Sequence, residues 1–92
     1  MPSRRGLLDI MASILRAAKD EGPITKTRAV YAANLNFSRA ERYLNMMVEL
    51  GLMEEVDRGG GRRAFKATEK GKAFLEDLGR LKARPSPSRT SA

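Results

Sequence analysis

Three arginines flank three consecutive glycines in the span Arg58-Gly-Gly-Gly-Arg62-Arg63, which contains no acid. Glycine lets a backbone approach a partner closely, and arginines at a loop tip can enter a minor groove or clamp phosphates. A nucleotide-binding loop carries Gly-Lys-Ser/Thr and leads into a helix, whereas this loop joins two predicted strands. We therefore predict that Arg58, Arg62 and Arg63 contact the minor groove or the backbone of DNA.

A second group of cations falls on a predicted helix over residues 38–50. Its apolar residues share one face: Ala40, Tyr43, Leu44, Met47 and Val48. Arg39, Arg42 and Met46 share an outward stripe. A helix in the major groove presents its N-terminal half to base edges, where Arg pairs with guanine and Asn with adenine. We predict a recognition helix whose DNA contacts are Ser38, Arg39, Arg42 and Asn45. The alternative is a solvated face on which Glu41 and Glu49 partly neutralise the arginines.

Lys26 and Arg28 begin another predicted helix. Free backbone amides at a helix N-terminus attract phosphate, and nearby cations strengthen that attraction. We include both residues among the predicted DNA contacts. A purely solvated helix start is an equally open alternative.

Catalytic chemistry has little support in this sequence, because it contains neither cysteine nor histidine. Thiolate nucleophiles, disulfides and the commonest metal ligand are thereby excluded. The carboxylates of Glu54, Glu55 and Asp57 fall on a predicted strand, where we interpret them as surface charge; a hard-cation site is the alternative. We predict no catalytic residue, no metal site and no small-molecule cofactor.

The charge balance points to a polyanionic partner. The chain has 92 residues and a net charge of +7, with a sequence pI near 10.4. Such an excess is typical of proteins that meet nucleic acid or an anionic membrane surface, although some proteins are simply basic. We expect no membrane partner, since no apolar run reaches transmembrane length. RNA is a further possible partner, but the scarcity of aromatic residues disfavours binding of single strands by base stacking.

The elements that position these residues follow from apolar spacing and from helix-end signals. A helix over 7–18 stops at Gly22-Pro23, and we prefer it to a signal peptide because Asp9 and Arg16 interrupt the apolar run. A short helix follows Thr25, and the helix over 38–50 is assigned a capping box of Ser38 and Glu41. Strands over 52–57 and 64–67 flank the glycine loop. Thr68 caps a last helix that ends before Pro85.

This order predicts a fold that is mainly α with a small β-hairpin, a winged helix-turn-helix. We expect one domain over residues 5–84 and a disordered tail over 85–92, which is rich in Pro, Ser and Thr. In the last helix, Gly71, Phe74, Leu78 and Leu81 follow the 3-4-3 spacing of a coiled-coil seam. We predict a homodimer through Phe74, Leu78 and Leu81. The alternative is that these residues serve the domain core.

Four segments resemble an archaeal winged helix family whose best-known members are the small ten-kilodalton DNA-binding proteins of Sulfolobus. They are residues 25–38 (Thr-Lys-Thr-Arg-Ala-Val-Tyr-Ala-Ala-Asn-Leu-Asn-Phe-Ser), Tyr43-Leu44, 50–53 (Leu-Gly-Leu-Met) and 65–75 (Phe-Lys-Ala-Thr-Glu-Lys-Gly-Lys-Ala-Phe-Leu). The resemblance implies a DNA-binding dimer joined by the C-terminal helix as an antiparallel coiled coil. Those members carry a longer final helix than the one that ends before Pro85 here.

These observations predict binding of double-stranded DNA by a cytoplasmic, nucleoid-associated protein, either a chromatin component or a transcriptional regulator. The recognition helix 38–50 would lie in the major groove and the wing 58–63 on the minor groove or backbone. The alternative is a winged helix module that binds another protein within a larger assembly. In that case Met46 and Met53 would be contact residues.

Overall fold

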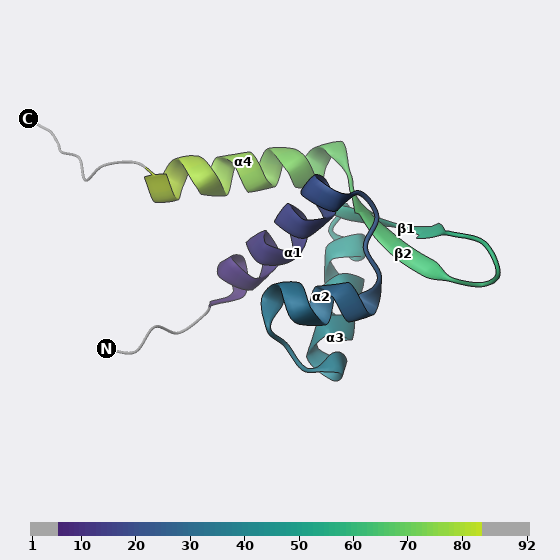
Figure 1. The fold of residues 1–92 in the computed structure, drawn as a ribbon. Coiled ribbons are helices and arrows are strands. Elements are labelled where there is room, and N and C mark those ends of the chain that lie inside the picture. The colour runs from purple at the N-terminus through teal and green to yellow at the C-terminus, as the bar shows by residue number, and fades with distance from the viewer. Residues whose placement is uncertain (1–5, 84–92) are drawn as a thin grey trace, which may run out of the picture.

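The computed structural model describes residues 6–83 and consists of four helices and one antiparallel hairpin. In chain order the elements are α1 (Leu7–Glu21), α2 (Lys26–Ala33), α3 (Phe37–Glu49), β1 (Met53–Asp57), β2 (Arg63–Ala67) and α4 (Glu69–Ala83). The hairpin projects away from the helices, and α1 and α4 lie side by side (Figure 1). This is the predicted winged helix-turn-helix. The predicted tail over 85–92 lies outside the described residues.

The core forms around α1, which packs against α2, α4 and β2. Its largest fully buried side chains come from α1, α3 and β1: Ile14, Leu15, Leu44, Met47 and Met53. Burying each such side chain stabilises the fold by about 1.5–3 kcal/mol. Because Met53 is only 2% exposed, the suggestion that it contacts another protein is wrong.

The apolar residues of α1 are not all buried. Leu7 and Leu8 are 52% and 49% exposed, whereas Ile10, Met11 and Ile14 are buried. The apolar side chains of α1 therefore enter the core only from its second turn.

The hairpin is joined to the helical part by a third extended segment. Met53 pairs with Ala67 and Asp57 with Arg63 across the two strands. On the other edge of β2, Phe65 and Ile24 exchange two backbone hydrogen bonds of 2.9 and 2.8 Å. The wing is thus fixed to the segment that leads into α2.

Local hydrogen bonds set where α2 and α3 begin and end. The Thr25 hydroxyl accepts from the Arg28 amide at 3.1 Å, as predicted for the cap of α2, and Asn34 makes the following turn in a left-handed conformation. The capping box of Ser38 and Glu41 is wrong. Asn36 caps α3 instead, accepting from the Arg39 amide at 2.7 Å, because Asn is among the best N-cap residues and lies one residue before the first helical one.

The first turn of α4 is held closely against the turn that joins α3 to β1. The Thr68 hydroxyl accepts from the Gly71 amide at 3.0 Å and donates to the Gly51 carbonyl at 2.6 Å. A Cβ atom at Gly71 would lie 2.0 Å from the Leu52 carbonyl oxygen. Gly71 therefore serves close packing inside the domain and is not part of an intermolecular seam.

Candidate nucleic-acid interface

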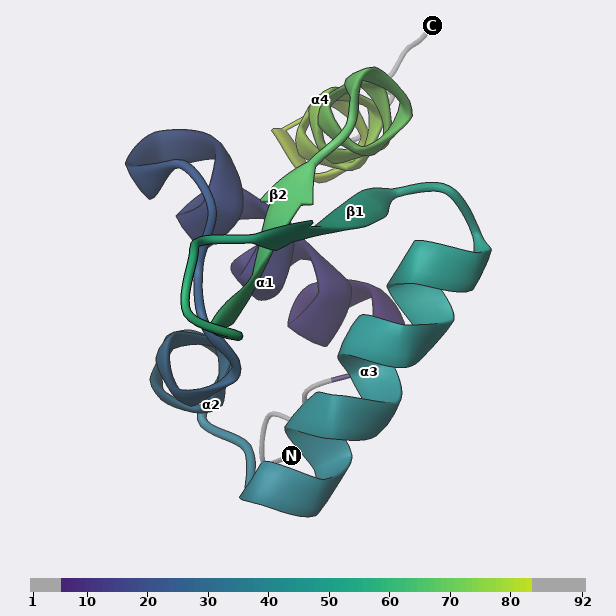
Figure 2. The same ribbon diagram turned by 90° about the vertical axis from the view of Figure 1, so that its right-hand side faces the viewer.

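The start of α2, the face of α3 and the wing surround one small hollow of about 120 Å³. Figure 2 looks toward these three elements from the side on which the wing projects. The α3–wing hollow, as we call it, is lined by residues of all three elements: Lys26, Glu41, Leu44, Asn45, Glu55, Arg63 and Phe65. Three predicted contacts, Lys26, Asn45 and Arg63, are thus brought together around it.

The outward face of α3 carries four exposed polar residues that the sequence assigns to DNA: Ser38, Arg39, Arg42 and Asn45. The Arg39 guanidinium lies 5.9 Å from the centre of the Tyr43 ring. Within residues 6–83, no acid forms an ion pair with Arg39 or Arg42. The carboxylate of Glu41 instead lies 3.6 Å from Lys26 Nζ.

The wing tip is a turn that requires its glycines. Gly59, Gly60 and Gly61 have φ angles of 99°, 61° and 76°, a region that other residues rarely adopt. The Arg58 amide donates to the Arg62 carbonyl at 2.8 Å, and the Asp57 carboxylate accepts from the Gly59 amide at 2.9 Å. The turn holds Arg58 and Arg62 in solvent, and neither has an ion-pair partner in the described part of the chain.

Arg63 differs from the other two wing arginines. Its guanidinium is 2.9 Å from the carboxylate of Glu55 on the neighbouring strand, although 74% of its side chain remains exposed. Although residues 58–63 contain no acid, Arg63 therefore has an acidic partner from outside that span. Sequence spacing could not reveal this pair, because the contact depends on the strand register.

The two cations of α2 are both paired. Lys26 lies near Glu41 and also 5.0 Å from the centre of the Phe37 ring. Arg28 donates from Nε to Glu21 at 2.9 Å, which links α2 to the end of α1. This hydrogen-bonded pair lowers the pKa of Glu21 and raises the pKa of Arg28. Arg28 does not line the α3–wing hollow, so it stands apart from the other predicted contacts.

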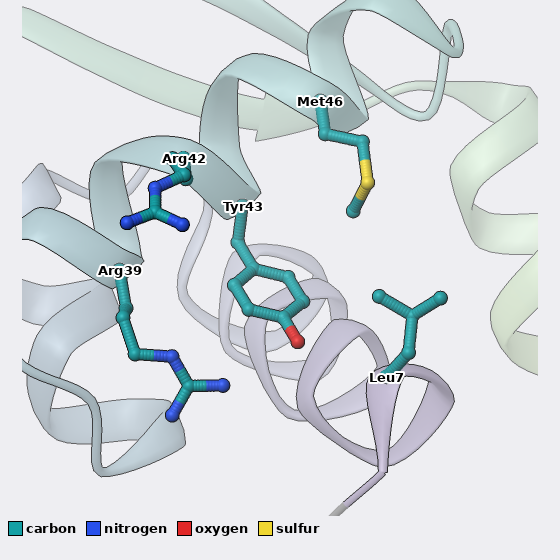
Figure 3. Close-up of a pocket in the computed structure, with 5 residues that line it drawn as sticks. All are labelled: Leu7, Arg39, Arg42, Tyr43 and Met46. Carbon is teal, nitrogen blue, oxygen red and sulfur yellow. The ribbon is translucent and has the colours of Figure 1, made fainter.

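A second, larger hollow of about 280 Å³ lies between the first turn of α1 and α3. Figure 3 shows the residues that line it, which are Leu7, Arg39, Arg42, Tyr43 and Met46. We call it the α1–α3 hollow. It contains two of the predicted DNA contacts and one exposed apolar residue of α1, Leu7.

The three residues of the predicted dimer seam have different surroundings. Leu78 is 9% exposed and belongs to the core of its own chain, Phe74 is partly buried against that core, and Leu81 is 64% exposed. Of the three, Leu81 alone presents most of its side chain to solvent.

Nowhere in residues 6–83 do three or more acidic, cysteine or histidine side chains gather so that they could hold a metal ion. No described helix has the length and apolar character needed to cross a membrane.

Residues 4–85 match the family described as winged helix-turn-helix. An uncharacterized protein of Methanocaldococcus jannaschii is 30% identical over 75 residues, which are 82% of this chain and 71% of that protein. The crystal structure of Sso10a-2, a DNA-binding protein from Sulfolobus solfataricus, superposes with a TM-score of 0.73 at 29% identity and covers 86% of this chain and 83% of its own. The PcaV transcriptional regulator from Streptomyces coelicolor has the same fold, with a TM-score of 0.74 at 24% identity over 91% of this chain and 60% of its own length.

Proposed function

The chain belongs to the winged helix-turn-helix family, and we propose that it binds double-stranded DNA, without catalysis, as a cytoplasmic chromatin-associated protein or transcriptional regulator. The observation that carries this proposal is the set of exposed arginines on α3 and the wing that lack an acidic partner within residues 6–83. The similarity to a DNA-binding protein of Sulfolobus solfataricus over most of both chains adds support.

In the proposed complex, α3 lies in the major groove and the wing reaches the adjacent minor groove or the backbone. Arg39, Arg42 and Asn45 face base edges, where Arg favours guanine and Asn favours adenine. Phosphate contacts come from the wing, from Ser38 and from the start of α2: Arg58, Arg62, Arg63, Lys26 and Arg28. Arg28 would contribute least, since Glu21 already holds its guanidinium.

A salt titration of duplex binding tests the proposal. If about five phosphates are neutralised per protomer, the slope of log affinity against log salt should be about −4 to −5. Arg58→Ala/Arg62→Ala should make this slope shallower by about 1.8. The control, Lys72→Ala/Arg80→Ala on α4, removes the same charge and should change it little. Salt-independent binding, or no binding at about 50 mM salt, would contradict the proposal.

We also propose that the protein is a homodimer whose contact includes the far end of α4, which extends beyond α1 (Figure 1). Leu81 is 64% exposed there, and a small domain gains stability when a second copy covers such a side chain. Phe74 and Leu78 would support the contact from within the chain. If the partner were another protein, this chain would instead be an interaction module of a larger assembly.

A further inference from the structure

The first turn of α3 presents an aromatic ring to solvent. Phe37 is the first residue of the helix and is 54% exposed, whereas Tyr43 and Met46 of the same helix are half-buried and pack against the core. This first turn is at the end of α3 that lies away from β1 (Figure 2). A recognition helix meets base edges with its N-terminal half, so Phe37 lies where the proposed function expects contact with bases.

Phe37 belongs to a stripe of α3 that borders the α3–wing hollow. Residues four apart are neighbours on a helix surface, so Phe37, Glu41 and Asn45 follow one another along α3. Glu41 and Asn45 line the hollow, as does Lys26 of α2. Because Lys26 Nζ is 5.0 Å from the centre of the Phe37 ring, the ring lies at the edge of this hollow.

The ammonium group of Lys26 restrains the Phe37 ring. A cation within about 6 Å of a ring centre is attracted to the π face, and the same ammonium lies 3.6 Å from the Glu41 carboxylate. These contacts join the first turn of α3 to the start of α2. A side chain that is already restrained loses less conformational entropy when it meets a partner.

The surroundings of Phe37 favour a small apolar partner on a polyanion. Exposed polar and cationic residues follow it on α3, namely Ser38, Arg39 and Arg42. The other exposed large apolar side chains of the described residues belong to α1, α2, α4 or the end of α3: Leu7, Leu8, Tyr31, Leu50 and Leu81. Protein-binding surfaces are marked by contiguous apolar patches, which one ring among cations does not form. In the major groove of DNA, by contrast, thymine presents a single methyl group that a phenyl ring can contact.

We propose that Phe37 contacts the 5-methyl group of thymine in the major groove and gives the protein a preference for thymine. The contact rests on the proposed function, in which α3 lies in that groove. Cytosine presents no methyl group at this edge, and uracil differs from thymine by lacking it. Contact with the ring removes the methyl group from water, so each thymine that is contacted should strengthen binding by about two- to fourfold.

The test compares two DNA polymers that differ in this methyl group. A labelled duplex is displaced from the full-length chain by the alternating polymer of dA and dT or by that of dA and dU, so that no preferred site has to be known. We expect the wild type to bind the thymine polymer about two- to fourfold more tightly. Phe37→Ser should make the two affinities equal by weakening the binding of the thymine polymer. Phe37→Leu keeps an apolar side chain and should keep a preference for thymine.

The matched control is Tyr31→Ser, which removes an aromatic ring that is 75% exposed on α2. It should keep the wild-type ratio of affinities. This control is needed because the methyl group also affects the shape of the duplex, which proteins can recognise. A ratio that survives Phe37→Ser would mean that shape or another side chain recognises the methyl group, and would overturn the proposal. Equal weakening on both polymers would place the ring against deoxyribose and would overturn it as well.

The wild type separates this contact from the proposed function. Equal affinity for the two polymers would overturn the thymine contact while DNA binding stands, whereas binding to neither polymer would overturn both. A second measurement needs no variant. In the complex of 13C-labelled chain with a thymine duplex, we expect an intermolecular nuclear Overhauser effect between the Phe37 ring protons and a thymine methyl group. Its absence would overturn the contact even if Phe37→Ser failed to fold.

Discussion

The cations near α3 and the wing divide into two groups. Arg39, Arg42, Arg58 and Arg62 form no ion pair within the described residues, whereas Lys26, Arg28 and Arg63 each lie beside a carboxylate. A phosphate gains less from a paired cation, because the existing pair must first be weakened. The affinity for DNA should therefore rest mainly on the first group.

We predict that Glu55→Gln strengthens DNA binding, because it frees Arg63 and removes a negative charge from the α3–wing hollow. An exposed ion pair is worth about 0.2–1 kcal/mol, so the Kd for DNA should fall by about two- to fivefold at low salt. Fluorescence anisotropy with a labelled duplex measures this change. The control is Glu54→Gln, whose carboxylate lies 3.9 Å from Lys66 Nζ and does not line the hollow. Weaker binding by Glu55→Gln would mean that Glu55 positions Arg63 for contact with the duplex.

A pH dependence of stability should arise from the pair of Glu21 and Arg28. The pKa of Glu21 is lowered in the folded state by its hydrogen bond to Arg28. The pair's contribution to the free energy of unfolding is therefore complete above the ordinary pKa of about 4.3 and is lost as the pH falls through the folded value. Urea unfolding between about pH 3 and 7 should show a smaller acid loss for Glu21→Gln than for the wild type. The Asp20→Asn control should keep the wild-type loss; equal curves for Glu21→Gln and the wild type would contradict the prediction.

At the scale of elements, sequence patterns locate the helices and strands well, because apolar spacing and cap residues are local properties. They fail where two nearby residues could each cap the same helix, or where residues distant in the sequence come into contact. Asn36 and Ser38 are both good helix caps, and the sequence pattern alone does not decide between them. The pairs Glu55–Arg63 and Lys26–Glu41 depend on strand register and helix packing. The sequence was sufficient to identify the exposed residues of the predicted site on α3 and the wing. It was not sufficient to show which of these residues already form ion pairs within the chain.

The contact between α4 and the turn that joins α3 to β1 leads to a prediction at Gly71. Gly71→Ala places a Cβ against the Leu52 carbonyl oxygen and should lower the free energy of unfolding by about 1–3 kcal/mol. Gly79→Ala, in the same helix, meets nothing within 4 Å and should raise it by about 0.5–1 kcal/mol. Chemical denaturation followed by circular dichroism measures both. A free energy of unfolding that rises for Gly71→Ala as well would contradict the close approach of Gly71 to Leu52.

At the scale of the whole molecule, the positive charge is unevenly distributed. Arg4, Arg5, Arg84 and Arg89 lie outside the described residues, in segments that contain no acid, and they account for more than half of the net charge of +7. Residues 6–83 are closer to balance, with cations and acids mixed on their surface. Its attraction to DNA therefore depends on where its free arginines lie.

The proposed dimer leads to a prediction at Leu81. Leu81→Glu should convert the dimer to a folded monomer of 10.2 kDa, because a carboxylate would enter an apolar contact without a partner. Leu81 is chosen over Leu78, whose replacement would damage the core of the chain itself. Size-exclusion chromatography with light scattering measures the mass. Leu50→Glu, at an exposed residue beyond the end of α3, should remain dimeric, and a monomeric wild type would contradict the prediction.

The hydrogen-bonded bridge between Ile24 and Phe65 has a mechanical consequence. Because this bridge fixes β2 to the segment before α2, the wing and the helix-turn-helix cannot change their spacing independently. In the proposed complex, a duplex whose grooves do not match this spacing must bend or change its groove width to meet both elements. Base steps differ in how easily they deform, so the protein would prefer flexible sequences even at base pairs that none of its side chains touches.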